Sequence, residues 1–456
     1  MAQSISQEAV VNTGLPGATA ASRYAGATTS GAPTTGTFAV GDYVVDQTGA
    51  MYVCTVAGTP GTWQLSGVSV NENIAGKNFV INGGMDIAQR GTSVSVGATT
   101  LTYTLDRWCS YTTSPTVTVS QIGIGNFAGT STATSSTSLT MSSATWSVNA
   151  YAGCVVTAGS STATVVSNTA TVLTVASWTG GTPSTGLFSI AGLTGFQYAI
   201  RTQRNSGQGA GTIYQSQSLE TKNSIPLAGQ TVTVSFWARD GANYSQTGNG
   251  LFVALGWNTT TDGNILNGGF TQPISTTQTI TTSWVRYSYT TTIPSNATQV
   301  GFYVTETAVG TAGANDYFDI TGVQLEIAPQ ATPFSRAGGS IGGELALCQR
   351  YYWQVGVGVL GPAVAISTSN LYGYVYTPVS MRLSPPTATA YQLVIQNAGF
   401  TGYSSVTTAS SLSISNGSSN IVGINYTSNV TSYSVGSNNW ISNNGGSSYL
   451  SLSAEL

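Results

Sequence analysis

Fifteen acidic residues and no histidine set the chemistry that this chain could perform. Without histidine, a Ser-His-Asp or Cys-His arrangement and a histidine-bound zinc are impossible. Two carboxylates could still cleave a glycan, and the tightest local group of acids is Asp316, Asp319 and Glu326. Strand alternation places residues 319 and 326 on opposite faces, a poor basis for a shared cleft. We therefore expect no enzymatic activity.

Aromatic side chains offer a second kind of chemistry, because sugars stack their C–H faces on Trp and Tyr rings. The candidate glycan contacts are Trp237, Arg239, Trp257 and Tyr303 in the middle of the chain, and Tyr372, Tyr374, Tyr376 and Trp440 near its end. The alternative for each is packing in a core or between subunits, because half-buried strands are rich in aromatic residues. Trp284 is predicted to be structural.

Charge is scarce, since Asp, Glu, Lys and Arg make up 6% of the residues, against about 25% in an ordinary soluble domain. Residues 109–200 contain none, and after residue 351 only Arg382 and Glu455 are charged. Disorder is not expected, because 41% of the chain is hydrophobic and 10% aromatic. A net charge of -3 gives no attraction to polyanions, so we expect no nucleic-acid partner.

The 4 cysteines lie far apart without CxxC spacing. They are Cys54, Cys109, Cys154 and Cys348, and the pattern predicts buried free thiols in a chain made in a reducing cytosol. The opening MAQSISQEAVVNTG lacks the basic and apolar regions of a signal peptide. No apolar run reaches the roughly 18 residues of a membrane span, so no membrane insertion is expected.

Short alternating strands separated by Gly, Pro and Asn predict an all-β chain with several antiparallel β modules in series, in a fibre-like arrangement. In Thr231–Asp240, for example, alternate residues beginning with Val232 form one apolar face, and Trp237 and Arg239 lie on the other. The predicted order is a flexible arm or attachment segment (1–19), a small three-stranded β module (20–70), a jelly-roll sandwich (78–125 with 194–337), an inserted Ser/Thr-rich β module (126–193), a short helical neck (338–353) and a C-terminal β head (354–456).

In the first module, the runs DYVVD and AMYVCTV flank a hairpin turn ahead of Trp63. Tyr43, Tyr52 and Trp63 are predicted to form its core, with a sugar-stacking role as the alternative. In the neck, Leu345, Leu347 and Cys348 could form the apolar edge of a helix over 343–351. That helix is too short for a coiled coil.

Two segments carry a resemblance to a known family. They are NFVINGGMDIAQRG followed by LDRW, within residues 78–108, and FDITGVQLEIAPQATPFSRAGGSIGGELALCQRYYW over residues 318–353. Together they resemble the opening and closing segments of a carbohydrate-binding-module-like jelly roll in bacteriophage tail fibre and minor tail proteins. The resemblance implies a homotrimeric virion protein of the host-facing tail, assembled in the host cytoplasm.

Such a protein would attach to other tail or capsid proteins through its N-terminal region and hold a host cell-surface glycan without turnover. Two alternatives stay open, namely a capsid head fibre or decoration protein and a glycan-degrading tail spike. The resemblance also implies a structural calcium between Asp86 and Asp319, since oxygen ligands suit that ion. An ordinary surface carboxylate is the alternative, because Met85-Asp86-Ile87 departs from the family's aromatic–acid pair. No other cofactor is expected.

Overall fold

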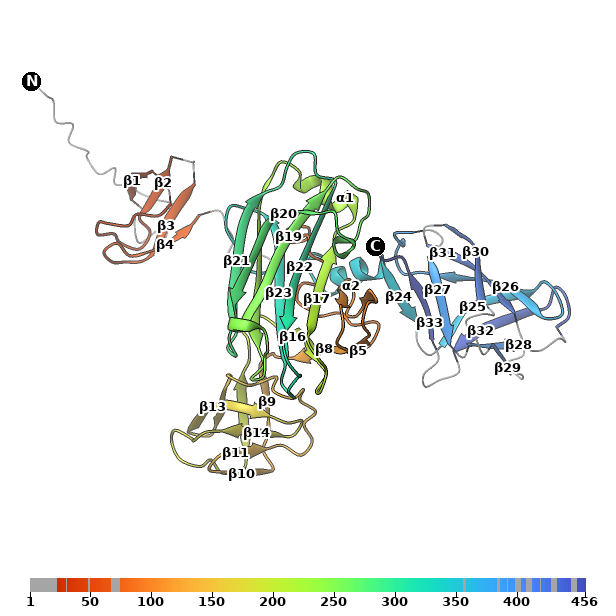
Figure 1. Ribbon diagram of the computed structural model, residues 1–456, viewed down its shortest axis with the longest axis horizontal. Helices are drawn as coiled ribbons and strands as arrows, with labels where there is room; N and C mark the ends of the chain where they lie inside the picture. The colour runs from red at the N-terminus through yellow and green to blue at the C-terminus, as the bar shows by residue number, and fades with distance from the viewer. Residues whose placement is uncertain are drawn as a thin grey trace, which may run out of the picture. The chain divides into compact units, whose positions relative to one another are not determined.

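The computed structural model describes residues 23–29, 31–47, 50–66, 74–355 and 358–383, and then 386–391, 393–397, 403–406, 412–418, 420–427, 433–443 and 449–456. These residues are nearly all β (Figure 1), which confirms the predicted fold class. They divide into two compact units, Met1–Glu72 and Asn73–Leu456. The predicted arm, 1–19, lies outside the described residues. Among the described helices, none is long and apolar enough to span a membrane.

The first unit contains a four-stranded sheet where the sequence predicted three strands. Its strands are β1 (Tyr24–Thr28), β2 (Tyr43–Asp46), β3 (Met51–Val56) and β4 (Thr62–Leu65), in that order. The strand missed was β1, which pairs in parallel with β2. Parallel pairing needs a connection longer than a hairpin turn, so no local pattern announces it. Trp63 packs edge-on against Phe38.

Two six-stranded sheets form the central sandwich of the second unit. The first sheet runs β21 (Val285–Thr292), β18 (Thr231–Asp240), β23 (Tyr317–Ile327), β16 (Tyr198–Arg204), β8 (Val117–Gly123) and β5 (Ser93–Val96). The second runs β20 (Thr271–Thr279), β19 (Gly250–Asn258), β22 (Gln299–Ala308), β17 (Gly211–Ser218), β7 (Cys109–Thr112) and β6 (Thr102–Tyr103). Apolar side chains from both sheets share one core, so the sheets pack face to face.

Strand β18 alternates as predicted, with Val232, Val234, Phe236 and Ala238 in that core. Its neighbour β23 does not alternate throughout, because a bulge around Gly322 shifts the pairing register and Gly322 has a positive φ of 61°. An extra residue exchanges the two faces of a strand. The inward residues are therefore Phe318 and Ile320 before the bulge but Val323 and Leu325 after it. Asp319 and Glu326 consequently lie on the same outer face, contrary to the expectation from simple alternation.

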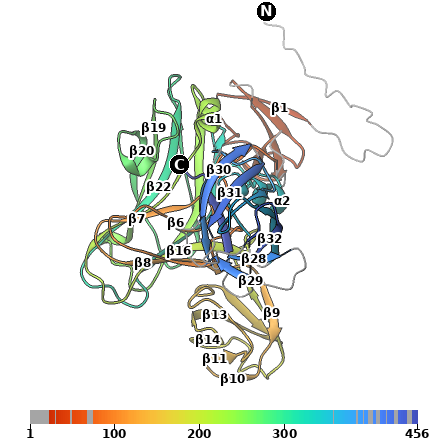
Figure 2. The same cartoon turned by 90° about the vertical axis from the view of Figure 1, so that its right-hand side faces the viewer.

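The inserted segment forms one seven-stranded sheet in the order β10, β11, β14, β13, β12, β15, β9. The bounds in that order are Ala133–Ser135, Ser138–Thr140, Val172–Val175, Ser161–Asn168, Val155–Ala158, Leu187–Ala191 and Phe127–Thr130. Trp146, Tyr151 and Phe188 form an aromatic core for it with the ring of Phe127. Figures 1 and 2 both show this sheet at one end of the sandwich strands.

After the sandwich comes helix α2 (Ile341–Gln349), which overlaps the helix predicted over 343–351 and has Ser340 as its N-cap. Helix α1 (Thr221–Ser224) and the 3-10 turns η1 (Ile225–Leu227), η2 (Thr247–Asn249) and η3 (Ile265–Asn267) are shorter.

The head has a three-stranded sheet, β24 (Tyr352–Val355), β33 (Tyr449–Ser453) and β27 (Thr387–Tyr391). Its seven-stranded sheet runs β29 (Tyr403–Val406), β28 (Leu393–Asn397), β32 (Asn438–Asn443), β25 (Gly358–Ala365), β26 (Asn370–Tyr376), β31 (Ile421–Thr427) and β30 (Leu412–Ser418).

Buried arginines bind the insert to the outer face of the first sandwich sheet. Arg201 and Arg239 both donate to the fully buried carboxylate of Asp319, at 2.8–2.9 Å. Arg201 also donates to the main-chain carbonyl of Val148 in the insert. Arg239 donates to three more carbonyls of the insert, those of Asn149, Ala150 and Ala152. Each guanidinium is thus shared between a sandwich acid and the insert backbone.

A second set of ion pairs binds the sandwich to the end of the chain. Glu455 accepts from Arg90 at 2.9 Å and from the buried Arg107. Arg382 donates to Asp262 at 2.8 Å and to the main-chain carbonyls of residues 454 and 455. Arg350, after α2, pairs with Glu220 at 2.7 Å. Several of the chain's few charges therefore connect its modules.

Replacing Asp319→Asn should destabilise the sandwich by about 3–5 kcal/mol at neutral pH, because two buried guanidinium groups lose their counter-ion. Burial favours the neutral carboxyl, but Arg201 and Arg239 outweigh it and lower the pKa of Asp319. Its contribution to stability should therefore be full above the ordinary pKa of Asp and be lost as the pH falls through the lowered value. Urea unfolding from acid to neutral pH measures both effects.

The matched control is Asp262→Asn, whose carboxylate is 29% exposed. It should lose roughly 1 kcal/mol or less, since solvent screens the pair. Equal losses in the two variants would contradict the role assigned to Asp319.

Candidate functional site

Four aromatic rings form a continuous stripe across the outer face of the second sandwich sheet. Tyr111, Tyr214, Tyr303 and Phe252 come from β7, β17, β22 and β19, which are neighbours in that sheet. The ring centroids of successive members lie 5.9, 5.8 and 5.9 Å apart. Tyr303 is 8% exposed, and the other three are half-buried. We call these four residues the aromatic stripe.

Strand alternation places these rings outside the core. Ile213, Val253 and Val304 point into the sandwich, so their neighbours Tyr214, Phe252 and Tyr303 point outward. Strand pairing then aligns rings from distant segments. Tyr214 lies opposite Tyr111 on one side and opposite Thr305 on the other. Thr305 in turn lies opposite Phe252.

Uncharged polar groups accompany the stripe. Gln272 on β20 donates from its amide to the Tyr303 hydroxyl at 3.0 Å, and Thr305 donates to the carbonyl of Ile213 at 2.7 Å. Burial raises the pKa of Tyr214, and also that of Tyr303, so both phenols stay neutral at physiological pH. Tyr303 is buried in an apolar cluster with Ala254 and Ile265, against which Tyr214 and Phe252 pack. The half-buried members Tyr111, Tyr214 and Phe252 can therefore offer part of their ring faces, and the stripe carries no ionised side chain.

Tyr303 is the one predicted sandwich residue that the structure places in the stripe. Trp257 lies instead on the inner side of β19, against the sandwich core. Trp237 and Arg239 do lie on the outer face of β18, but other groups cover that face. Trp237 packs with the cluster around Phe196, and Arg239 is 1% exposed beneath the insert. The structure therefore brings none of Trp237, Arg239 and Trp257 into the aromatic stripe.

The structure gives Trp284 a packing role. Its ring lies 4.7 Å from the Arg239 guanidinium and belongs to the same cluster as Trp237.

The four predicted head residues all lie on one face of the seven-stranded sheet. Leu371, Gly373 and Val375 point inward on β26, so Tyr372, Tyr374 and Tyr376 point outward. On β25, Val364 pairs with Tyr372 and therefore lies on the same face as the tyrosines. Pro362 is on that face of β25 too, and it pairs with Trp440, so Trp440 also lies on this face. Tyr374 and Tyr376 are 45% and 62% exposed. We call this surface the head tyrosine face.

The two predicted calcium ligands are engaged with different arginines. Both carboxylate oxygens of Asp319 accept from Arg201 and Arg239, while Asp86 accepts from Arg336 at 2.8 Å. A cation would have to displace these guanidinium groups, so the arrangement does not fit calcium at this pair. Among the described residues, no group of three or more His, Cys, Asp or Glu side chains could hold a metal.

Three further acids lie inside one part of the sandwich. Asp240 and Glu306 are on inward positions of β18 and β22, and Asp316 precedes β23. Arg204 donates to Asp316 at 2.6 Å. Burial and the neighbouring Asp316 raise the pKa of Glu306 well above its usual value, and burial raises the pKa of Asp240 to about 6. All three acids are buried, so they do not face a surface cleft.

No protein-family model matches the chain, and no curated protein matches it. Among solved structures, the enzymatically active domain of tailspike protein 4 from bacteriophage CBA120 aligns at a TM-score of 0.22 and 9% identity, covering 30% of this chain and 16% of that one. The CBM22-1 xylan-binding domain of Paenibacillus barcinonensis Xyn10C aligns at 0.21 and 16% identity, covering 31% of this chain and 78% of that one.

A third structure, TmCBM61 in complex with β-1,4-galactotriose, aligns at 0.20 and 17% identity, covering 30% of this chain and 74% of that one. Likenesses at these TM-scores assign neither a family nor a function to the chain.

Proposed function

We propose that the aromatic stripe binds a neutral glycan without chemical turnover. The observation that carries the proposal is the alignment of Tyr111, Tyr214, Tyr303 and Phe252 into one outward-facing row across four strands. Sugar rings stack on such faces through their C–H groups, and their hydroxyls pair with nearby amides and hydroxyls. Gln272 and the tyrosine hydroxyls supply these partners.

Binding without turnover is supported by the residues that the site lacks. The chain has no histidine, and the stripe itself contains no carboxylate. The nearby strand acid Glu306 is fully buried and points into the sandwich. General acid catalysis on a bound glycan requires a carboxyl group within hydrogen-bond reach of the scissile bond, and the stripe offers none.

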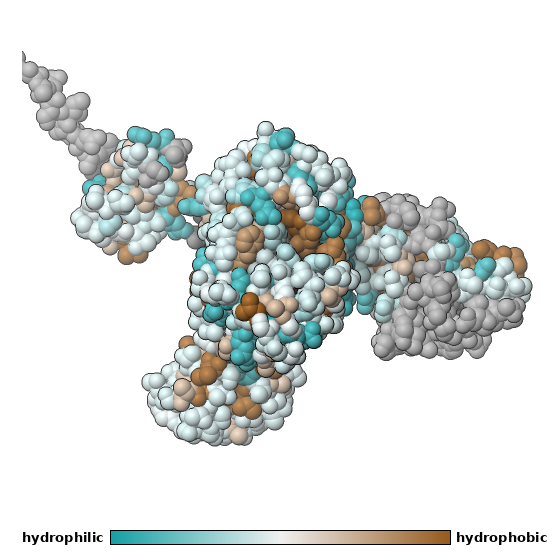
Figure 3. Space-filling model, in the orientation of Figure 1, coloured by the Kyte–Doolittle hydropathy of each residue, from teal (hydrophilic) through white to brown (hydrophobic). Residues whose placement is uncertain are grey.

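We place this activity on a bacteriophage virion, in a tail fibre or minor tail protein that holds the host surface. The support is the sequence resemblance of residues 78–108 and 318–353. A low-charge surface of Ser, Thr and Gly suits a passive adhesive protein, and Figure 3 shows intermediate hydropathy over most of the visible described surface. Attachment to other virion proteins would use the N-terminal region.

Tyr214→Ala should weaken glycan binding about tenfold, since a stacked ring contributes on the order of 1 kcal/mol. Tyr214→Phe keeps the ring and should bind nearly as well as the natural chain. A glycan array probed with the full chain identifies the ligand, and isothermal titration measures the variants.

The control for this experiment is Tyr198→Ala, which removes a 38% exposed tyrosine from the opposite sheet. It should leave affinity unchanged. An array without any neutral ligand, or equal affinities for Tyr214→Ala and the natural chain, would contradict the proposed site. Release of oligosaccharide from the bound glycan would contradict the absence of turnover.

The proposal includes a homotrimer whose subunits meet through the head tyrosine face. Tyr374, Tyr376 and Val364 are 45%, 62% and 42% exposed there, and Ile366, just beyond β25, is 53% exposed. Exposed apolar patches of this kind mark contact surfaces. Because the face has no ionised group, a second copy meets it without burying charge.

Light scattering should therefore give the mass of three chains, and the double substitution Val364→Asp and Tyr376→Asp should give one. Placing carboxylates in the contact would leave them buried and unpaired. A natural chain that is monomeric at micromolar concentration would refute the trimer.

A further inference from the structure

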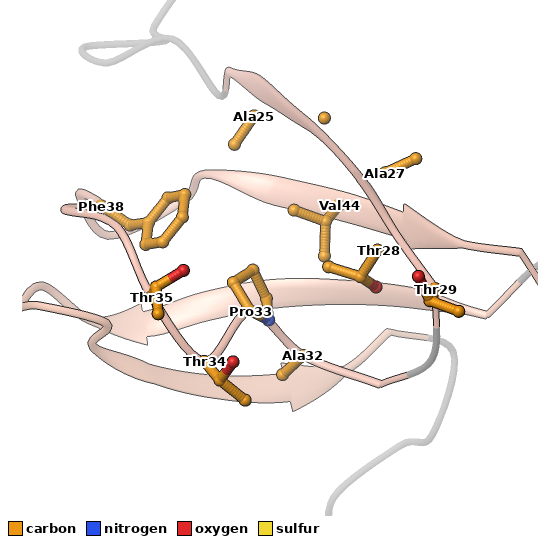
Figure 4. A pocket seen from close by; sticks show the side chains of 11 residues that line it. Ala25, Ala27, Thr28, Thr29, Ala32, Pro33, Thr34, Thr35, Phe38 and Val44 are labelled. Carbon is orange, nitrogen blue, oxygen red and sulfur yellow. The ribbon is translucent and has the colours of Figure 1, made fainter.

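The cavity of the N-terminal unit, between its sheet and the loop of residues 32–38, contains no ionisable side chain (Figure 4). It lies over a sheet face, because the paired neighbours Gly26 and Val44 both line it. Nothing in the structure shows what covers this face, so we assign no ligand to it.

A buried polar cluster lies at the end of β23. Gln324 and Glu326 are two residues apart on that strand and share its outer face. The following loop folds back over this face and brings Thr332 onto both side chains. Pro329 and Pro333 restrict the backbone of the loop. Gln324, Glu326 and Thr332 are all buried, so the cluster is shielded from bulk water.

The Thr332 hydroxyl in this cluster is placed as a nucleophile. It donates to Glu326 Oε2 at 2.5 Å, and a carboxylate in such contact can take the proton as a general base. Gln324 Nε2 lies 3.3 Å from the same hydroxyl oxygen. Because Gln324 Cδ is one bond of about 1.33 Å from Nε2, it lies at most about 4.6 Å from that oxygen. Rotation about the side-chain bonds of Thr332 can bring the two atoms into contact.

The side-chain amide of Gln324 is held in one orientation. Its Oε1 atom accepts from the N–H of Ser335 at 2.7 Å, a donor placed where negative charge would develop during attack on Cδ. Its Nε2 atom donates to Glu326 Oε1 at 2.7 Å. The carboxylate of Glu326 thus contacts both the hydroxyl that would lose a proton and the nitrogen that would receive one.

We propose that Thr332 and Gln324 form an intramolecular ester with release of ammonia. The hydroxyl proton passes to Glu326 as Thr332 Oγ1 bonds to Gln324 Cδ, and the N–H of Ser335 stabilises the charge on Oε1. The C–N bond of the amide then breaks, and Glu326 returns the proton to the leaving nitrogen. One C–O bond replaces one C–N bond, no group is oxidised or reduced, and Glu326 ends unchanged. The fold supplies the proximity that the reaction needs, and the ammonia is lost to solvent.

The ester would fix the end of β23 covalently to the loop that continues towards α2. A network held by hydrogen bonds alone is the alternative. The inference is independent of the glycan proposal, because Gln324, Glu326 and Thr332 belong neither to the aromatic stripe nor to the head tyrosine face.

The test is mass spectrometry of the full chain after it is denatured and cut at glutamate. Cleavage after Glu306, Glu326 and Glu344 separates fragment 307–326, which contains Gln324, from fragment 327–344, which contains Thr332. We expect the two fragments to stay joined in one species that is lighter than their sum by one ammonia. Hydroxylamine, which cleaves esters and spares amides, should separate them.

Three variants identify the groups that react. Thr332→Val removes the hydroxyl and should give two separate fragments, while Thr332→Ser keeps a hydroxyl and should give the joined species. The control is Thr290→Val, which removes an exposed hydroxyl that donates to Pro329 of the same loop. It should leave the fragments joined. Separate fragments from the natural chain, joined fragments from Thr332→Val, or a joined species that resists hydroxylamine would each overturn the proposal.

Discussion

The ion pair between a buried arginine and a buried carboxylate is the interaction on which the arrangement of the second unit depends. Asp319 neutralises two guanidinium groups that hold the insert, and Glu455 neutralises two that hold the end of the chain. An unpaired charge at such sites costs several kcal/mol, so each pair forms only when its modules are in place. The pairs therefore act as connectors that specify which surfaces meet.

This use of charge has a consequence for the outer surfaces. The chain has 12 basic and 15 acidic residues in 456. Because many of these charged residues form internal contacts, few remain to recognise a partner. The aromatic stripe and the head tyrosine face are accordingly built from rings, hydroxyls and amides. Surfaces of this composition suit neutral partners, for which stacking and hydrogen bonding replace electrostatic attraction.

The sequence predicted the all-β class and the alternation of β18, because both depend on local pattern. It did not predict what covers an outer face, so Arg239 looked available although the insert buries it. It also missed the bulge at Gly322, which places Asp319 and Glu326 on the same outer face instead of on opposite faces.

Within the aromatic stripe, only Tyr303 was predicted. Tyr214 and Phe252 each follow a core residue on an alternating strand, a signal available in the sequence. Their alignment with Tyr111, however, depends on pairing between segments about a hundred residues apart, which no local pattern specifies.

We infer above all that the charges are internal and that the recognising surface is neutral. The most direct test of this inference is glycan binding by the full chain between roughly 0.05 and 0.5 M salt, a range over which screening lengths shrink severalfold. We predict nearly constant affinity for a neutral glycan over this range. A steep loss of binding with salt, or binding confined to anionic glycans, would contradict it.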